Sequence, residues 1–446
     1  MHGTATSLLL EVLPFYVGYE EKRWMKRKGF VMSGTAKKGV GMAMVPILAI
    51  FALGASQGGV NAGLNTMAMA FPEAGANIGY VVSMVALGMI PAGILSGMIT
   101  GKYVKYRTTI IIAIICYLIS GCFPFFLSEG SSFTVLLVSR FIFGVAVGWS
   151  YPLANALTFK LIEDAEQRAT WLGIGFAFFN IGTIFMEFAG GYLALISWQA
   201  CFLVYLIGII PLILVVIILK EPESDVEQEE KLAAEAGVEA DTKVPFVVYL
   251  YCILLTLGVT FAMPTILYAS MIASVSFGLD AAAAGLVLSV MTIVGMLCGF
   301  TMGPVFKLIG KWIVPVGGIW LGLFFCGCAY FASTGDMVPW LICFFVGHWG
   351  FVAIINGTGN WLTNLVPVGA ATKTMGIYTA FHQMGCFLAT PASTFLVGVL
   401  GLAVGAGVSM TVDYVGLMMP ASIIVVIVGV VMAILTAFTK QRESRA

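Results

Sequence analysis

Apolar stretches, each about long enough to cross a lipid bilayer, follow one another along most of this chain. Few of them show the two-residue alternation of a membrane β-barrel. A helical span needs about 20 apolar residues, and backbone groups in lipid must be satisfied within their own element, which favours helices. The pattern predicts twelve spanning helices, at residues 43–68, 78–101, 107–127, 133–159, 169–195, 198–219, 244–268, 281–303, 312–333, 338–362, 371–400 and 412–438.

The same glycine-containing pattern, G-x-x-x-G-x-x-x-K, closes the second and the eighth of these segments. A repeat of this kind in an apolar chain is typical of solute carriers built from two similar bundles with a site between them. Close crossing of two helices requires small side chains, so we expect these positions to lie at helix crossings and to form a gate. They are Gly97, Gly101 and Lys105 in the first copy, and Gly299, Gly303 and Lys307 in the second.

A second echo relates the fifth segment to the eleventh. The stretch GIGFAFFNIG in the fifth aligns with GIYTAFHQMG in the eleventh, which places Asn180 over Gln383 and Phe179 over His382. The two echoes together predict an all-α membrane protein in which twelve transmembrane helices form two pseudo-symmetric six-helix bundles, a 6+6 arrangement.

The chain outside these bundles is polar or irregular. Residues 1–40 hold an apolar stretch too short to span and broken by Glu11 and Pro14. We expect residues 1–31 to be a disordered extension upstream of a start at Met32, with an interfacial amphipathic anchor as the alternative. The expected divisions are 1–40 for the extension, 41–219 and 244–440 for the bundles, 220–243 for an acidic cytoplasmic linker and 441–446 for a tail.

Lys and Arg are unequally divided between the two sides of this arrangement. With both termini placed in the cytoplasm, all 22 basic residues lie on the inner side or in the tails except Arg140, which falls within a span. The charged side chains of the outer loops are all acidic. This asymmetry follows the positive-inside rule and predicts a multi-pass protein of the plasma (inner) membrane with both termini inside.

Composition and motifs argue against other classes of protein. Charged residues make up 10% of the chain, against about 25% in soluble domains. The chain contains no P-loop, nucleophile elbow or metal-ligand spacing, so we expect no enzyme, no metal and no cofactor. The nine cysteines are expected to pack as small residues. Expected partners are a small-molecule substrate, protons and the lipid bilayer, for a monomer that binds no nucleic acid.

Three stretches resemble motifs of the major facilitator superfamily. GMITGKYVKYR is similar to its basic loop G-x-x-x-D-R-x-G-R-K, with Gly101 in place of the acid that helps to lock the inward gate in that family. SRFIFGVAVGWSYP resembles its R-x-x-x-G-x-x-x-G segment, and the fifth span resembles the antiporter signature G-x8-G-x3-G-P-x2-G-G, with Met186 and Glu187 replacing the Gly-Pro pair. The resemblance covers roughly residues 41–440, is closest in style to 12-helix drug/proton antiporters, and implies alternating access.

Two charged side chains fall deep within the predicted spans, away from their ends: Arg140 in the fourth and Glu187 in the fifth. An unpaired charge in lipid is costly, and at 1.5 Å per residue the depths of the two differ by only about 5 Å. We therefore expect Arg140 and Glu187 to lie close enough to interact. We interpret them as a proton-coupling site, and a static ion pair that braces the helices is the alternative.

Polar residues within the spans are the candidates for binding substrate. Gln57, Asn61 and Asn65 have four-residue spacing, so a helix would place them on one face, towards a cavity or, alternatively, in hydrogen bonds between helices. Histidine titrates near neutral pH, although packing is the common role of a lone histidine on a helix. The remaining candidates are Asn180 in the fifth span, His348, Asn356 and Asn360 in the tenth, and His382 and Gln383 in the eleventh.

The features together favour a secondary active transporter that works by proton-coupled efflux of a small, mostly apolar or weakly charged compound. One alternative is proton-coupled uptake of an organic anion held by Arg140 or the histidines. A second is a membrane sensor that kept the fold without transporting. The gate pattern in both halves favours transport, because a sensor has no need of a gate.

Overall fold

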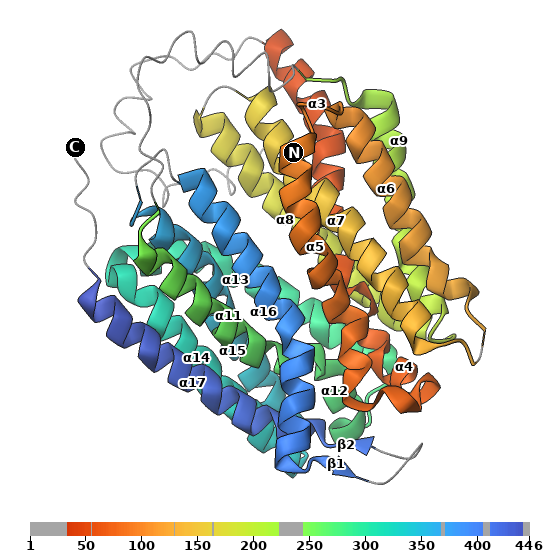
Figure 1. Ribbon diagram of the computed structural model, residues 1–446, viewed down its shortest axis with the longest axis vertical. Helices are drawn as coiled ribbons and strands as arrows, with labels where there is room; N and C mark the ends of the chain where they lie inside the picture. The colour runs from red at the N-terminus through yellow and green to blue at the C-terminus, as the bar shows by residue number, and fades with distance from the viewer. Residues whose placement is uncertain are drawn as a thin grey trace, which may run out of the picture.

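The computed structural model describes residues 34–54, 56–128, 130–162, 165–222, 244–366, 371–404 and 411–439. Almost all of these residues are helical, and the one sheet among them is a two-residue antiparallel pair, β1 (Ala403–Val404) with β2 (Thr411–Val412). Figure 1 shows the long helices in two groups that lean against each other. The expected extension, linker and C-terminal tail lie largely or wholly outside the described residues and stay predictions.

Six spanning segments make up the N-terminal half, and several of them combine an α-helix with a tighter 3-10 helix. In order they are α3 (Gly34–Leu53), η2 (Ser56–Gly63) and α4 (Leu64–Ala70); η3 (Pro72–Gly79) and α5 (Tyr80–Ile99); α6 (Tyr106–Cys122) and η4 (Phe123–Phe126); α7 (Phe133–Leu161); α8 (Ala165–Ala194); and η5 (Ala200–Gly208) and α9 (Ile209–Ile218).

Six further segments make up the C-terminal half. They are α11 (Phe246–Leu267) and α12 (Ala269–Phe277), α13 (Ala281–Ile309), η6 (Gly310–Trp312) and α14 (Ile313–Thr334), α15 (Met337–Thr363), α16 (Ala371–Leu400) and α17 (Tyr414–Phe438). Within the described residues, eleven helical stretches are long and apolar enough to cross a membrane, and one of them, Ala281–Thr334, contains both α13 and α14. Counting these two separately gives the twelve spans that the sequence predicts.

The first span is not the continuous helix expected at 43–68. Helix α3 ends at Leu53, residues 56–63 wind as a 3-10 helix, and α4 follows. The 3-10 segment reads SQGGVNAG, and glycine is a weak α-helix former. The seventh span, its counterpart in the repeat, is also divided, between α11 and α12 at Tyr268. Both breaks lie where the two halves meet.

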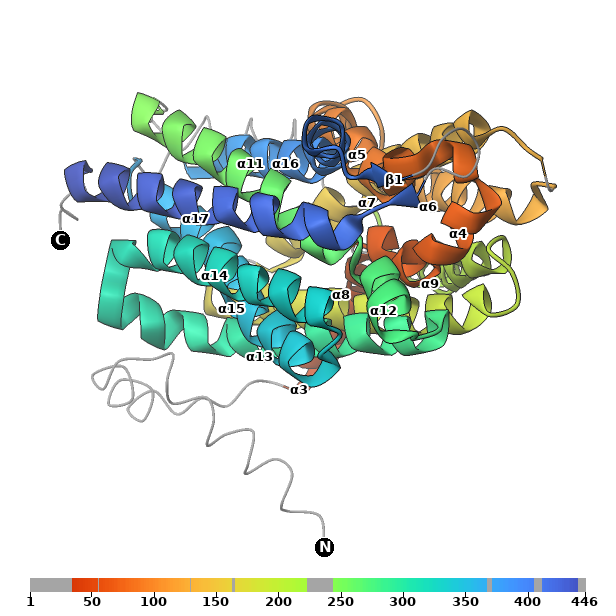
Figure 2. The same ribbon diagram turned by 90° about the horizontal axis from the view of Figure 1, so that it is seen from below.

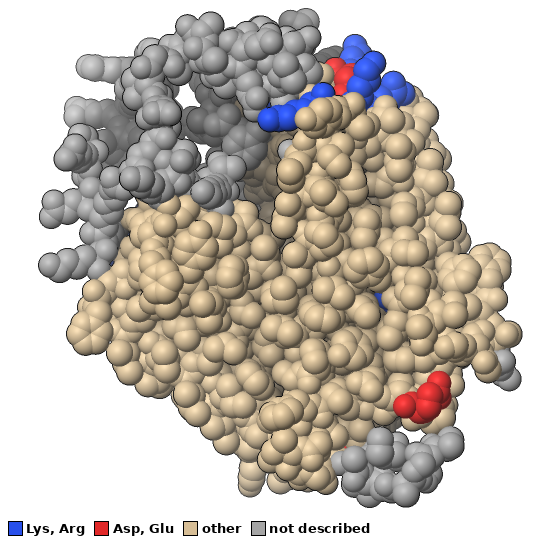
Figure 3. Space-filling view, in the orientation of Figure 1, with Lys and Arg blue, Asp and Glu red and all other residues tan. Residues whose placement is uncertain are grey.

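The helical body is apolar around its middle and charged at its ends, as expected for a protein that crosses a membrane. Large hydrophobic side chains such as Ile119, Ile217 and Phe300 are well exposed on its outer faces. In Figure 3 most of the visible Lys and Arg side chains gather at the upper end, and a wide band with a single small basic patch separates them from an acidic side chain near the lower end.

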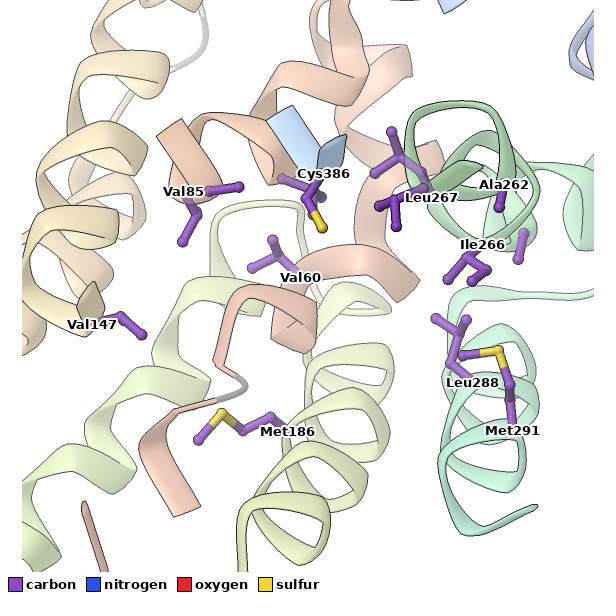
Figure 4. Close-up of a cluster of buried hydrophobic side chains, with 14 of the residues drawn as sticks. Val60, Val85, Val147, Met186, Ala262, Ile266, Leu267, Leu288, Met291 and Cys386 are labelled. Atoms are coloured by element: carbon purple, nitrogen blue, oxygen red, sulfur yellow. The ribbon is translucent and has the colours of Figure 1, made fainter. Parts of the chain in front are cut away.

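The two halves pack through four long helices, α5 against α16 and α8 against α13 (Figure 1 and Figure 2). Small residues permit the closest approach, since a Cβ added at Gly191 of α8 would lie 2.6 Å from the carbonyl oxygen of Ala281. Apolar side chains from both halves fill the middle of the contact, among them Val60, Met186 and Leu288 (Figure 4). This seam between the halves is the region in which a transporter of this build holds its substrate.

Candidate functional site

Hydrogen bonds between the two halves are confined to one side of the seam. In the part of the chain that the structure describes, all of them lie between the middle of the spans and the end that carries β1 and β2, which we call the sealed side. They join Asn61 with Ser270, Asn65 with Ser274, Gly75 with Tyr414, Ala76 with Tyr268, Asn77 with Thr394, Ser83 with Thr390, Met89 with Gln383, Ile184 with Ser289, and Glu187 with Thr292.

The opposite end of the seam, which carries Lys105 and Lys307, has no such bonds in the described residues, and we call it the open side. A Cβ added at Gly173, Gly299 or Gly376 would meet no atom within 4 Å. The molecule is therefore closed across the seam on one side and separated on the other, one of the two arrangements that alternating access requires.

Glu187 lies at the middle of the seam and is only 4% exposed. Its Oε2 accepts a hydrogen bond from Thr292 Oγ1 of the opposite half at 2.9 Å. Its Oε1 faces η2, 3.3 Å from the position that a Cβ on Gly58 would take. None of the described basic side chains forms an ion pair with it. A carboxylate buried without a cation is costly, so Glu187 is a group whose charge should depend on the state of the seam.

Asn61 lies beside Glu187 on the face of η2. Its Nδ2 is 3.9 Å from the same added Cβ on Gly58, and its Oδ1 is buried without a hydrogen-bond partner in the described part of the chain. Such an acceptor costs about 1–3 kcal/mol. Asn61 and Glu187 thus both bring polar atoms to the same position beside Gly58 in the seam.

Arg140 does not pair with Glu187, so the expected ion pair is wrong. The side chain is fully buried within the N-terminal half, where Nε donates to the carbonyl oxygen of Val81 at 2.7 Å and Nη1 to Tyr205 Oη at 3.1 Å. Its guanidinium carbon lies 4.7 Å from the ring centre of Phe143 and 5.7 Å from that of Phe202. Similar depth on adjoining helices is therefore not enough to bring Arg140 and Glu187 together, because Arg140 points into the N-terminal half and Glu187 points across the seam.

The Arg140 network supports the break in the first span. Tyr205 Oη donates to the carbonyl oxygen of Ser56 at 3.1 Å, and Tyr117 Oη donates to Ser56 Oγ at 2.9 Å. These bonds satisfy groups at the start of η2 that a continuous α-helix would have bonded internally. Arg140 thus acts on η2 through Tyr205, and sequence reasoning missed both tyrosines because they lie on other spans without a motif.

The two histidines and Gln383 occupy different environments. His348 is 8% exposed and packs between α15 and α13, with Nε2 2.7 Å from a Cβ added at Gly295 and Nδ1 lacking a partner among the described residues. The His382 ring stacks on Tyr378 at 6.3 Å between ring centres, on the open side. Gln383 is buried and contacts Met89 of the opposite half through Nε2.

The asparagine candidates divide between the two sides of the seam. Asn65 donates to Ser274 Oγ at 3.0 Å on the sealed side. Asn180 is buried and bonds to the carbonyl oxygen of Phe176 in its own helix. Asn356 and Asn360 are exposed, one turn apart on α15, on the open side. The shared face expected for the first-span residues does not hold, because residues 56–63 are not α-helical; the side chain of Gln57 lies outside what the structure describes.

Two glycines of the repeated G-x-x-x-G-x-x-x-K pattern, Gly101 and Gly299, are not at helix crossings in this conformation. Gly101 lies beyond the end of α5 in a turn with φ of 83°, which favours glycine. Gly299 has nothing within 4 Å of an added Cβ. The surroundings of Gly97 are not described, Gly303 is half-buried in α13, and Lys105 and Lys307 are exposed. The prediction of close crossings is therefore wrong for Gly101 and Gly299 in this state, and for Gly97 and Gly303 it stays a prediction.

The second echo does place equivalent residues in equivalent contacts. Gly182 of α8 packs against the backbone of Ala52 in the first span, and Gly385 of α16 packs against Thr256 and Val259 in the seventh. The partners Gly173 and Gly376 both face open space. The repeat read from the sequence is therefore also a repeat of packing.

Aromatic rings gather on the open side of the seam. Phe51, Tyr151 and Phe179 form a chain in the N-terminal half, with ring centres 6.0 and 5.4 Å apart, and Phe176 stacks on Phe179 at 5.9 Å. His382, which aligns with Phe179 in the repeat, supplies a ring from the other half. No group of three or more His, Cys, Asp or Glu in the described residues is arranged to hold a metal ion.

Proteins of known function resemble this chain in sequence over part of its length. A 3-(3-hydroxy-phenyl)propionate transporter of Escherichia coli is 28% identical over 194 residues, which is 43% of this chain and 45% of that protein. The quinolone resistance protein NorA of Staphylococcus aureus is 27% identical over 191 residues, which is 42% of this chain and 47% of that protein. These matches thus span about half the length of each relative.

Solved structures resemble the whole fold. The nucleoside transporter NupG superposes with a TM-score of 0.71 at 13% identity, over 90% of this chain and 100% of that one. The inward open xylose transporter XylE from E. coli does so with a TM-score of 0.68 at 14% identity, over 91% of this chain and 97% of that one. At these identities the likeness concerns the fold, which consists of two six-helix halves. The sequence profile of the Major Facilitator Superfamily matches residues 29–390, and this chain therefore belongs to that family of transporters.

Proposed function

We propose that this transporter exports a small aromatic compound, neutral or cationic, in exchange for protons, with Glu187 as the proton-carrying group. The observation that carries the proposal is the isolation of this carboxyl in the seam. It bonds to Thr292 of the other half, and Arg140, a basic side chain fully buried near the middle of α7, bonds to Val81 and Tyr205 of its own half instead. Arg140 becomes a positioning residue for η2 in this proposal.

The orientation that we propose places the open side in the cytoplasm. Lys102, Lys105 and Lys307 lie at that end, and cytoplasmic loops carry the excess of Lys and Arg. Both termini then lie in the cytoplasm of a plasma membrane protein that acts as a monomer. The structure corresponds in this orientation to a carrier ready to take up substrate from inside the cell.

The substrate class follows from the side chains on the open side. Phe176 and the half-buried His382 offer aromatic faces, while the exposed Asn356 and Asn360 offer donors and acceptors at a depth where polar side chains face water rather than lipid. The charged side chain at the middle of the seam is the carboxyl of Glu187, while Arg140 is fully buried within the N-terminal half, which disfavours an anion. Both curated relatives are named for aromatic compounds, a hydroxyphenylpropionate and quinolones.

The cycle runs as an exchange at the seam. With Glu187 protonated, the sealed side is free of buried charge and the halves stay closed there. Loss of the proton to the cytoplasm leaves an ionised carboxylate without a cation, and a cationic or hydrogen-bonding substrate offsets that cost. The loaded carrier then separates on the sealed side, where an external proton replaces the substrate. The glycines that face open space, Gly173, Gly299 and Gly376, supply the contact surfaces when the open side closes.

Everted membrane vesicles test the proposal. An energised vesicle holds an acid interior, and an exported compound added outside should release protons, read with a pH-sensitive dye across a panel of aromatic cations, neutral aromatics and aromatic acids. Glu187→Gln should abolish proton release at normal protein level, whereas the exposed control Glu73→Gln should behave as the parent does. Proton release that survives in Glu187→Gln would overturn the role of Glu187.

Uptake of an aromatic acid by proton symport is the second candidate, favoured by the name of the E. coli relative and by His382 beside the open side. In this case intact cells should accumulate a labelled aromatic acid in a manner that a protonophore abolishes, and everted vesicles should give no proton release with the cationic members of the panel. A chain that moved no compound in either system would favour the sensor.

A further inference from the structure

We propose that the sealed side holds a second small-molecule site, distinct from the substrate site, that takes a small organic ammonium compound and keeps the seam closed. A cavity of about 230 Å³ lies there, between α4 and the end of α8 on one side and α12 and the start of α13 on the other. This inference rests on alternating access, not on proton coupling or on the direction of transport.

Both halves supply the walls of this cavity. Asn65 and Thr66 come from the N-terminal half, and Ser270, Ser274 and Asp280 come from the C-terminal half. Asn65 and Ser274 touch across it, with Nδ2 to Oγ at 3.0 Å. Alternating access requires the halves to part on this side, so the cavity exists only while the sealed side is closed. A ligand bound between the two walls therefore stabilises the closed arrangement and no other.

The chemistry of the walls selects a cation with hydrogen-bonding groups. Asp280 is the charged side chain of the lining, and its Oδ1 caps α13 by accepting from the Ala283 amide at 2.8 Å, which leaves Oδ2 to meet a ligand. The hydroxyls of Thr66 and Ser274 and the amide of Asn65 are groups that bind alcohols and ammonium ions well. Asp336 and Asp413 lie at the same end of their helices, whereas the described Lys and Arg side chains outside the spans lie at the other end, so the local potential favours cations.

The size of the cavity limits the ligand. At roughly 30 Å³ per water-sized group, 230 Å³ accommodates about eight non-hydrogen atoms. A compound such as 2-amino-1,3-propanediol, with one ammonium and two hydroxyls, fits this limit, and glycerol is its uncharged counterpart of equal size. A ligand this small with one rim-exposed ion pair should bind with a dissociation constant on the order of 1 mM.

The consequence for transport is inhibition from the sealed side. At ten times its dissociation constant, the ligand multiplies the ratio of closed to open molecules on this side by about 11. Because it binds far from the open side, it does not compete with a substrate that enters there. An amine supplied from the sealed side should therefore slow turnover without changing the concentration at which substrate half-saturates the open side.

Thermal unfolding of the full-length purified protein in lipid nanodiscs tests the site without knowledge of the substrate. We expect 2-amino-1,3-propanediol to raise the unfolding midpoint in a saturable manner, and glycerol at the same concentrations to raise it without saturation or not at all. Asp280→Asn should abolish the saturable shift, because asparagine keeps the helix cap but removes the charge. Asp336→Asn, the same change at the cap of α15, should retain it.

A second measurement tests the site even if the Asp280→Asn variant folds poorly. A cysteine in place of Ser83, buried on the sealed side, should react with an impermeant maleimide about 11-fold more slowly at ten times the dissociation constant, and glycerol should leave the rate unchanged. The proposal is overturned by an equal saturable shift with glycerol, by an unchanged shift in Asp280→Asn, or by no slowing of Ser83→Cys labelling.

Discussion

Replacing Thr292 with valine should loosen the sealed side of the seam. Thr292 Oγ1 donates to Glu187 Oε2 at 2.9 Å across the two halves, so the bond exists only while that side is closed. Valine keeps the shape of threonine and removes the hydroxyl. The substitution therefore acts on the equilibrium between closed and open arrangements without creating a cavity.

The size of the effect follows from the charge of the acceptor. A hydrogen bond to an ionised group contributes about 1.5–3 kcal/mol, and one between neutral groups contributes about 0.5–1.5 kcal/mol. At 1.4 kcal/mol per factor of ten, the ratio of open to closed molecules should rise about 10- to 100-fold with an ionised Glu187 and about 2- to 10-fold with a protonated one. In a protein that also carries Glu187→Gln, Thr292→Val should raise the ratio of open to closed molecules much less than it does with an ionised Glu187, because glutamine carries no charge.

Cysteine labelling measures this ratio without a known substrate. The reporter is Ser83→Cys, which is 3% exposed and lies on the sealed side, and its rate of reaction with an impermeant maleimide follows the population of molecules open there. The parent protein, which keeps its native cysteines and lacks Ser83→Cys, gives the background rate of labelling. Thr260→Val is the matched control, because Thr260 is 4% exposed but its hydroxyl bonds to Gly385 within the C-terminal half.

A clear result would refute this reasoning. If Thr292→Val and Thr260→Val labelled at the same rate, and both within twofold of the reporter alone, the bond between Glu187 and Thr292 would contribute nothing to closure. Glu187 would then be a buried carboxyl without a coupling role through the seam, and the search for the proton carrier would move to His382.

Three further predictions concern other parts of the chain. Arg140→Gln should lower the level of folded protein, since breaking a buried charged network costs about 3–5 kcal/mol. Tyr205→Phe removes the bonds of the hydroxyl to Ser56 and to Arg140 but leaves Arg140 its bond to Val81, and should be milder. Equal levels of the parent and both variants in a detergent-stability assay would contradict the positioning role. Gly376→Leu should leave the protein level unchanged but block transport, because the leucine side chain meets nothing while the open side is open and obstructs its closure. Gly385→Leu should instead reduce the protein level, because position 385 contacts Val259. Normal transport by Gly376→Leu would exclude a gate there. Deletion of residues 1–31 should leave insertion and transport unchanged, as immunoblots of membrane fractions would report.

The sequence by itself determined the class of the protein and its architecture. The period and length of its apolar stretches are set by the thickness of the bilayer and by the need to satisfy backbone groups locally, so twelve spans in two halves could be read without a structure. The repetition of Gly173 and Gly182 as Gly376 and Gly385 could also be read from the sequence. A small residue such as Gly182 or Gly385 is needed wherever the backbone of one neighbouring helix comes close. Family membership followed from motifs of the same kind.

Only the tertiary structure decided which polar groups meet. Depth along a helix can be counted from the sequence, but the direction of a side chain depends on how that helix is rotated against its neighbours, and this is why Arg140 turned to Tyr205 and Glu187 to Thr292. The interruption at η2 shifted the first-span residues off the face that α-helical spacing predicts, and it placed Asn61 beside Glu187 while Asn65 went to the sealed-side cavity. Such contacts join residues far apart in the chain, and no local pattern encodes them because each depends on the packing of whole helices.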